Sequence, residues 1–440
     1  MENAIGAAGD PQTVYLDFNA TTPVAPEVLE AIHHALKDCW GNPSSSHHYG
    51  IKAKKVIDEA RTNVARMINL DDASGIKTCQ WKRVSEFLLT KLCIIMILIK
   101  LDILFTSGGT EANNMVIRSV TTHYSRLCKE SGDLPHIITS NMEHDSVKLV
   151  LEKLANENIL EYTVVNATQA SGGTVKCDGI TQLVRPNTCL ISIMLANNET
   201  GIIQPIAEIA KAVKALNCVR ELHNRIYFHT DAAQALGKIP VKVKDLGVDY
   251  LTIVGHKFYG PRIGALYVKN LDAKETPLYP MIFGGGQERN MRSGTENTGM
   301  IAGLGKAASL VAQNVELYST HMAKIRDYLE DRLKEKFGEM VHFNGQFPTS
   351  QRIPNTCNVS FIGKELKGWD ILANAKILVA SIGAACHAQD RPSEILLSIG
   401  IPKEIAYNAL RLSVGRETSI SDIDRVISDI QHVIDRLRLH

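Results

Sequence analysis

A lysine and an aspartate stand at the ends of two apolar runs in the middle of the chain. Lys257 follows residues 251–255, and Asp231 follows residues 226–228. Each run predicts a strand that delivers a polar side chain to a loop. A lysine forms a Schiff base with the aldehyde of pyridoxal phosphate (PLP), and a carboxylate keeps the pyridine nitrogen protonated so that the ring accepts electrons. The pair therefore indicates PLP chemistry.

Both residues also have ordinary interpretations. Lys257 could be a surface lysine at a strand end, the commonest position for a lysine, although its neighbours His256 and Phe258 make exposure less favoured. Asp231 could cap the helix that residues 232–236 favour. A buried acid without a cationic neighbour needs a partner, and a pyridinium is such a partner.

Gly109 and Thr110 lie where a strand pattern passes into a helical pattern. Glycine lets backbone amides face an anion, and the amino end of a helix adds a favourable field. These two residues are therefore candidates to bind the cofactor phosphate. A tight turn with a threonine N-cap explains them equally well when they are taken alone.

Other polar residues follow strands or lie on expected loops. His144 could stack on a cofactor ring, and Asn198 could donate to the ring hydroxyl, although an Asx turn also suits Asn198. Cys386 lies beside His387, which could promote its thiolate. Arg411 could bind a carboxylate in a bidentate way. Alone, each of these residues is more often structural.

The elements that must position these residues form an alternating pattern. Strands are predicted at 103–105, 136–139, 162–165, 189–194, 226–229, 250–253 and 264–268, with helical patterns between them. Such alternation predicts an α/β fold with a doubly wound, mostly parallel sheet, in which ligands bind beyond the carboxyl ends of the strands.

The pattern changes after residue 286, where a long helical stretch, two further strands and a final helix predict a smaller α+β domain. We expect a large cofactor-binding domain over residues 24–300. Residues 1–23 and 301–440 would form the small domain, which carries the Cys386 loop.

Residues 71–100 fit this pattern poorly, because their second half is apolar without helical or strand periodicity. The uniformly apolar part, residues 92–99, is far shorter than the roughly 18 residues of a spanning helix, and Lys91 and Lys100 bound it. A buried strand or helix is favoured over a membrane anchor.

Composition narrows the class of protein. The 440 residues are 45% hydrophobic and 22% charged with a formal net charge of +1, which gives no electrostatic case for binding nucleic acid or a membrane. Nine cysteines without metal-ligand spacing predict free thiols in a reducing compartment and no metal site. The first twelve residues lack a signal pattern, so a cytosolic location is expected.

Ordered motifs along nearly the whole chain resemble one family. The chain resembles the NifS-like class of fold-type I PLP enzymes, the cysteine desulfurases and selenocysteine lyases, and is most similar to the selenocysteine lyase group. The motifs are residues 15–23, 41–45, 253–262, 283–289 and 383–387. Two departures are Val254, where many cysteine desulfurases have serine, and residues 71–100, which have no counterpart in the family.

The resemblance implies roles around the cofactor ring. Lys257 would carry the Schiff base and then act as base and acid at the substrate carbons. Asp231 would pair with the pyridinium, Gln234 and Asn198 would face the ring hydroxyl, and His144 would stack on the ring.

The resemblance also implies phosphate and substrate contacts. Gly109, Thr110 and His256 would bind the phosphate, and Thr295 would reach in from the partner subunit of a homodimer. In the substrate site, Arg411 would bind the carboxylate with Asn19 nearby, and Cys386 would act at the chalcogen.

The implied reaction decomposes L-selenocysteine to L-alanine and selenium, which leaves as selenide with a reductant or passes to a possible acceptor protein. Two alternatives remain open on sequence. One is a cysteine desulfurase that yields persulfide and alanine. The other is an inactive dimeric scaffold or isoform disrupted by the insertion of residues 71–100.

Overall fold

The computed structural model describes residues 13–70, 102–128, 132–221, 224–383 and 391–439. The predictions made for residues 71–100 and for Cys386 lie outside these ranges.

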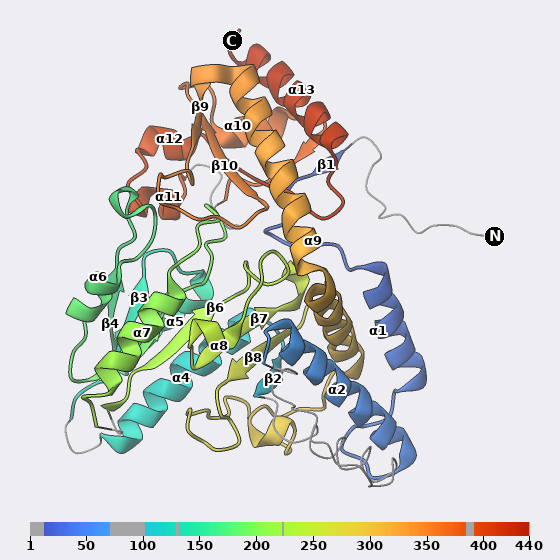
Figure 1. The fold of residues 1–440 in the computed structure, drawn as a ribbon, viewed down its shortest axis with the longest axis vertical. Helices are drawn as coiled ribbons and strands as arrows, with labels where there is room; N and C mark the ends of the chain where they lie inside the picture. The colour runs from blue at the N-terminus through green and yellow to red at the C-terminus, as the bar shows by residue number, and fades with distance from the viewer. Residues whose placement is uncertain (1–12, 71–101, 129–131, 222–223, 384–390, 440) are drawn as a thin grey trace, which may run out of the picture.

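A seven-stranded sheet forms the lower part of the molecule in Figure 1, with the strand order β2-β8-β7-β6-β5-β3-β4. Its strands are β2 (Ile103–Thr106), β3 (His136–Ser140), β4 (Glu161–Val165), β5 (Thr188–Ser192), β6 (Tyr227–Asp231), β7 (Tyr250–Val254) and β8 (Gly264–Val268). β8 runs antiparallel to both of its neighbours, β2 and β7, and the other four adjacent pairs of this sheet are parallel. The predicted fold class, a doubly wound and mostly parallel sheet, is confirmed.

Helices cover both faces of this sheet. Because successive residues of a strand point to opposite faces, neighbouring residues of β2 pack against different helices. Leu104 packs with apolar residues of α4 (Gly109–Leu127) and α5 (Asp145–Asn156). Its neighbours Ile103 and Phe105 pack with residues of α2 (His48–Met67), α7 (Ile206–Asn217) and α9 (Thr298–Phe337). This explains why every residue of β2, β3, β5, β6, β7 and β8 is buried. The short helices α6 (Cys177–Gln182) and α8 (Val243–Leu246) complete this part of the chain.

The upper part of the molecule contains two small sheets. The order β12 (Ala409–Ser413), β10 (Thr356–Phe361), β9 (Val341–Phe343) makes an antiparallel sheet, and β1 (Val14–Tyr15) pairs in parallel with β11 (Leu378–Val379). The N-terminal segment therefore packs beside C-terminal elements. The helices here are α10 (Gly368–Asn374), α11 (Glu394–Ser398), α12 (Lys403–Tyr407) and α13 (Ile420–Leu437).

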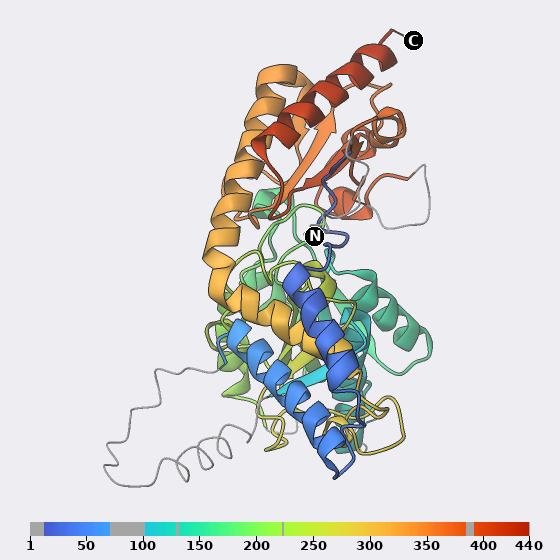
Figure 2. The ribbon, with the colours of Figure 1, turned by 90° about the vertical axis from the view of Figure 1, so that its right-hand side faces the viewer.

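The long helix α9 joins the two parts, as Figures 1 and 2 show. Its residues up to Val311 belong to the core of the large sheet, and its residues from Met322 belong to the core of the upper part. The predicted division at residue 300 stays a prediction. The helices α1 (Pro26–Asp38) and α2 pack against the first half of α9, where a Cβ on Gly305 would lie 2.5 Å from the Cα of Ala60.

A buried clasp holds the edge strand β2 in place. Arg61 of α2 donates from both terminal nitrogens to the Glu288 carboxylate at 2.9 and 2.6 Å. Glu288 also accepts from the backbone N–H of Phe105 at 2.8 Å, and Arg61 donates to the carbonyl of Ile103 at 2.7 Å. Because β2 also pairs with β8 along its whole length, the strand that follows residues 71–100 is not displaced.

Within the residues that the structure describes, no helix is long and apolar enough to span a bilayer.

Candidate active site

The site lies where β6 and β7 end side by side. The two strands are parallel, with Asp231 opposite Thr252, so their carboxyl ends meet at one edge of the sheet. Asp231 is the last residue of β6, and Lys257 ends the single 3-10 turn Gly255–Lys257 that follows β7. The structure therefore brings together the lysine and the carboxylate that the sequence placed at strand ends.

The Lys257 amine is held by two carbonyl groups. Its Nζ donates to the carbonyl oxygens of Asn19 at 2.7 Å and Ala20 at 2.9 Å. Burial and the charge of Arg411 together lower the pKa of Lys257 from 10.5 to about 8, although the charges of Asp231 and Asp17 act in the opposite direction. A larger share of the amine is therefore neutral, and hence nucleophilic, at neutral pH than for an ordinary lysine.

Asp231 is buried and accepts hydrogen bonds only from neutral donors among the described residues. Asn113 of α4 donates its Nδ2 to Oδ2 at 2.8 Å, and the backbone N–H of Ala233 donates to Oδ1 at 2.9 Å. Thr252 of β7 fixes the Asn113 amide by donating to its Oδ1 at 2.7 Å. Since a buried carboxylate needs a counter-charge, a ring with a protonated nitrogen fits this position.

His144 is joined to Asp231 through two other side chains. His144 caps α5, and its Nδ1 accepts from the backbone N–H of Ser146 at 3.1 Å. The Ser146 hydroxyl lies 2.9 Å from the same Nδ1 and accepts from Asn113 at 2.8 Å. Because Nδ1 is an acceptor, a neutral imidazole carries its proton on Nε2.

Asn19 is the most connected residue of the site. Its carbonyl oxygen accepts from Lys257 and, at 3.0 Å, from Gln234 Nε2. Its side-chain Oδ1 accepts from Lys238 and Asn355, each at 2.9 Å. Its Nδ2 donates at 2.8 Å to the hydroxyl of Thr356 and at 3.2 Å to a carbonyl oxygen. The side-chain amide of Asn19 is thus already hydrogen-bonded to other protein groups. The predicted contact of Asn19 with the substrate stays a prediction.

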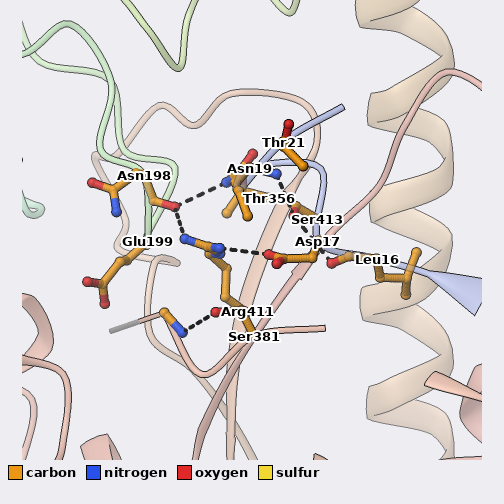
Figure 3. A network of polar contacts seen from close by, with 12 residues as sticks. Leu16, Asp17, Asn19, Thr21, Asn198, Glu199, Thr356, Ser381, Arg411 and Ser413 are labelled. Carbon is orange, nitrogen blue, oxygen red and sulfur yellow. Dashed lines mark hydrogen bonds and ion pairs between the residues drawn. The ribbon is translucent and has the colours of Figure 1, made fainter. Parts of the chain in front are cut away.

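Arg411 of β12 faces the site across a network drawn in Figure 3. Its Nη2 donates to Asp17 Oδ1 at 2.7 Å, and its Nη1 donates to the carbonyl oxygen of Asn198 at 3.2 Å. Its Nε is buried and has no hydrogen-bond acceptor among the described residues. The Asn198 side chain points away from Arg411 in Figure 3. The free Nε–H is a position that a substrate carboxylate would satisfy.

The predicted phosphate residues lie around the start of α4. This helix begins at Gly109, where a Cβ would lie 2.6 Å from Cγ2 of Val254, so the close approach of loop and strand requires glycine. His256 places its Nδ1 3.1 Å from the Thr21 hydroxyl. Burial lowers the pKa of His256 to about 4, with Lys257 and Arg262 adding to the effect, so the ring is neutral at pH 7.

Two predicted residues are not in this cluster. Thr295 is exposed and lines a hollow with Trp40 and Asn42. Cys386 lies outside the described residues. The roles assigned to the individual site residues stay predictions.

Several residues that organise the site were missed on sequence, namely Asn113, Ser146, Thr252, Lys238 and Asp17. One signal was available. Lys238 stands four residues after Gln234, a spacing that places side chains next to each other on a turn of helix. Asp17 gave no such signal, because its partner lies 394 residues away.

The pKa of Lys257 leads to a first prediction. In cofactor-free protein, we expect the rate at which Lys257 reacts with acetic anhydride to rise with pH and to level off above about pH 8, because only the neutral amine attacks. Peptide mass spectrometry after short labelling pulses would measure the rate. A rate that still rises steeply at pH 10 would contradict the low pKa.

The chain is similar to several known proteins. The aminotransferase class-V family model matches residues 14–79 and 95–426. The chain is 51% identical to selenocysteine lyase of Bos taurus, over 96% of this chain and 94% of that protein. It is 38% identical to cysteine desulfurase IscS of Dictyoglomus turgidum, over 97% and 95%. A solved NifS-like protein superposes with a TM-score of 0.77 at 29% identity, covering 96% of this chain and 99% of that one.

Proposed function

The chain belongs to the aminotransferase class-V family, and from this membership we propose that it is a PLP-dependent lyase that decomposes L-selenocysteine to L-alanine and selenium. The observation that carries the proposal is the meeting of the Lys257 amine and the buried Asp231 carboxylate at two adjacent strand ends. The choice of substrate follows the relatives, since identity is 51% to a selenocysteine lyase and 38% to a cysteine desulfurase.

The residues present fit PLP. Asp231 would hold the pyridinium, Gln234 and Asn198 would face the ring hydroxyl, and His144 would cover the ring. The phosphate would bind at the start of α4 with Gly109, Thr110 and His256, where the helix field favours an anion. When bound, PLP links the substrate amine and accepts the electrons released at the substrate carbons.

Lys257 moves the protons in this proposal. Its neutral amine removes the Cα proton of the substrate and later returns a proton to Cβ, which becomes the methyl group of alanine. The carbonyls of Asn19 and Ala20 hold Nζ in position for both transfers. The carboxylate of Asp231 would keep the pyridine nitrogen of the cofactor protonated, so that the ring can accept electrons.

The Cβ–Se bond breaks with its electron pair left on the substrate, because Lys257 then protonates Cβ to give the methyl group of alanine, so selenium leaves at the oxidation level of elemental selenium. A selenol is more acidic than a thiol and its bond to carbon is weaker, so selenium needs less nucleophilic help than sulfur does. The Cys386 thiolate would attack selenium, so that an S–Se bond forms as the Cβ–Se bond breaks. A thiol reductant would then release the selenium as selenide and be oxidised to a disulfide, or a thiol of an acceptor protein would take the selenium over.

Arg411 would bind the substrate carboxylate with its free Nε–H while Asp17 and Asn198 hold its two terminal nitrogens.

We expect Arg411→Lys to raise KM for selenocysteine by about 10- to 100-fold with a smaller change in kcat, because a hydrogen bond to an ionised group is lost. Steady-state kinetics would measure both constants. Arg436→Lys, on the exposed face of α13, is the matched control, and a KM within twofold of wild type in Arg411→Lys would refute the role.

A homodimer is part of the proposal. The hollow around Thr295 is bordered by exposed apolar side chains, with Leu36 57% and Trp40 65% accessible. A second copy would cover them and receive Thr295 at its phosphate site.

Mixing inactive Lys257→Ala chains with Thr295→Ala chains should give dimers with one site that lacks both changes and one that carries both. A monomer by sedimentation would refute this arrangement.

The deciding experiment measures alanine release from selenocysteine and from cysteine by the same preparation. The lyase predicts a strong preference for selenocysteine, whereas comparable rates would favour the cysteine desulfurase. Absence of Schiff-base absorbance would favour the inactive scaffold. We also propose a cytosolic location, which cell fractionation would test.

A further inference from the structure

A second lysine, Lys238, is buried beside Lys257 and has no part in the proposed reaction. Only 4% of its surface is exposed. Its Nζ donates to Gln234 Oε1 at 2.6 Å and to Asn19 Oδ1 at 2.9 Å. Among the described residues, no carboxylate lies within ion-pairing distance of it. A buried amine without a counter-ion is costly, so its place calls for an explanation.

The two residues that accept hydrogen bonds from Lys238 are connected to the amine of Lys257 through the carbonyl oxygen of Asn19. Gln234 Nε2 donates to the carbonyl oxygen of Asn19 at 3.0 Å, and Lys257 Nζ donates to the same oxygen at 2.7 Å. Lys238, Gln234 and Asn19 therefore form a closed ring of three hydrogen bonds, and Lys257 is attached to that ring.

The ring decides which way the Gln234 amide points. A lysine amine in this position donates, so the group of Gln234 that faces it must be the oxygen. The Nε2 group is then turned to the other side, where it donates. A donor is what an ionised ring hydroxyl of the cofactor requires, whereas the amide oxygen would repel it.

We propose that Lys238 is a positioning residue that fixes Gln234 with its Nε2 toward the cofactor and holds Asn19 against Lys257. The cofactor half of this inference rests on the proposed function. The half that concerns Asn19 is a property of the protein chain alone.

The electrostatics of the site agree with this role. Burial lowers the pKa of Lys238 well below its usual value, and the charges of Lys257 and Arg411 lower it further. Burial therefore disfavours the charged form of this amine. The two acceptors match two of its N–H groups, which agrees with the donor role.

Lys238→Met removes both donors and keeps an unbranched side chain. In the cofactor-free protein, we expect amide hydrogen exchange of the segment that contains Asn19 and Ala20 to become up to about 10-fold faster, because the segment loses one hydrogen bond. In the holoenzyme, we expect PLP to dissociate about 10-fold faster. The pH at which the Schiff-base absorbance titrates should rise by about one unit, because the ring oxygen loses its donor and holds a proton more tightly.

Four further variants make the test specific. Lys211→Met, on the exposed face of α7, is the matched control and should change none of these quantities. Lys238→Gln keeps a polar donor and should shift the titration less than Lys238→Met. If Lys238 acts through Gln234, the double variant Lys238→Met/Gln234→Leu should titrate like Gln234→Leu alone.

The outcomes separate the inference from the proposed function. Unchanged exchange and an unchanged titration in Lys238→Met would overturn the inference, as would additive shifts in the double variant. A lower unfolding temperature with neither change would show a purely structural lysine and would also overturn it. A wild-type protein without a Schiff-base band would refute the proposed function, and the exchange result would then still decide whether Lys238 positions Asn19.

Discussion

Lys257→Ala is expected to lower kcat for alanine release by about 10⁴-fold or more and to abolish the Schiff-base absorbance. The loss is large because the variant removes both the covalent attachment and the group that transfers protons at Cα and Cβ. Visible absorbance and steady-state alanine release would measure the two effects in the same preparation.

Lys257→Arg separates the covalent role of Lys257 from its charge. Arginine keeps a positive donor near the carbonyls of Asn19 and Ala20 but forms no Schiff base, so we expect it to be as inactive as alanine. Recovery of more than a few per cent of wild-type activity in Lys257→Arg would mean that the charge, and not the amine nucleophile, supports catalysis.

Asp231→Asn is expected to lower kcat by about 10³-fold while the protein still binds PLP. The amide has the shape of the carboxylate but lacks its charge, so the ring nitrogen loses the partner that keeps it protonated in a buried site. Kinetics, together with the absorbance of bound PLP, would show a loaded but slow enzyme.

Asn113→Ala is the comparison variant for Asp231→Asn. It removes one neutral donor to the carboxylate and leaves the charge in place, so we expect only about a 10-fold loss. If Asp231→Asn and Asn113→Ala were equally active, the charge of Asp231 would have no special role.

The strands could be predicted because their signals are local. Most strands of the large sheet are short runs rich in β-branched and aromatic residues that alternate with helical patterns, and sequence order then places Asp231 and Lys257 at strand ends. Parallel pairing of β6 and β7 brings these ends together, so the most important pair of the site follows from elements that periodicity reveals.

The surroundings of this pair could not be predicted in the same way. Lys238 meets Asn19 across 219 residues, and Arg411 meets Asp17 across 394. No periodicity links such positions, since their contact depends on how β1, β12 and the end of β6 pack in three dimensions. Only the structure shows that the side chain of Asn19 is hydrogen-bonded to other protein groups.

The clasp of Arg61, Glu288 and Phe105 affects how the length of the connection between α2 and β2 can vary within the family. The family match is interrupted at residues 80–94, within the connection from α2 to β2. Doubling the length of a flexible connection costs only about 0.6 kcal/mol in closure entropy, provided that its two ends are held independently. Arg61 and Glu288 hold both ends through contacts outside the connection. Evolution or alternative splicing can therefore lengthen this connection while β2 and the start of α4 at Gly109 keep their places.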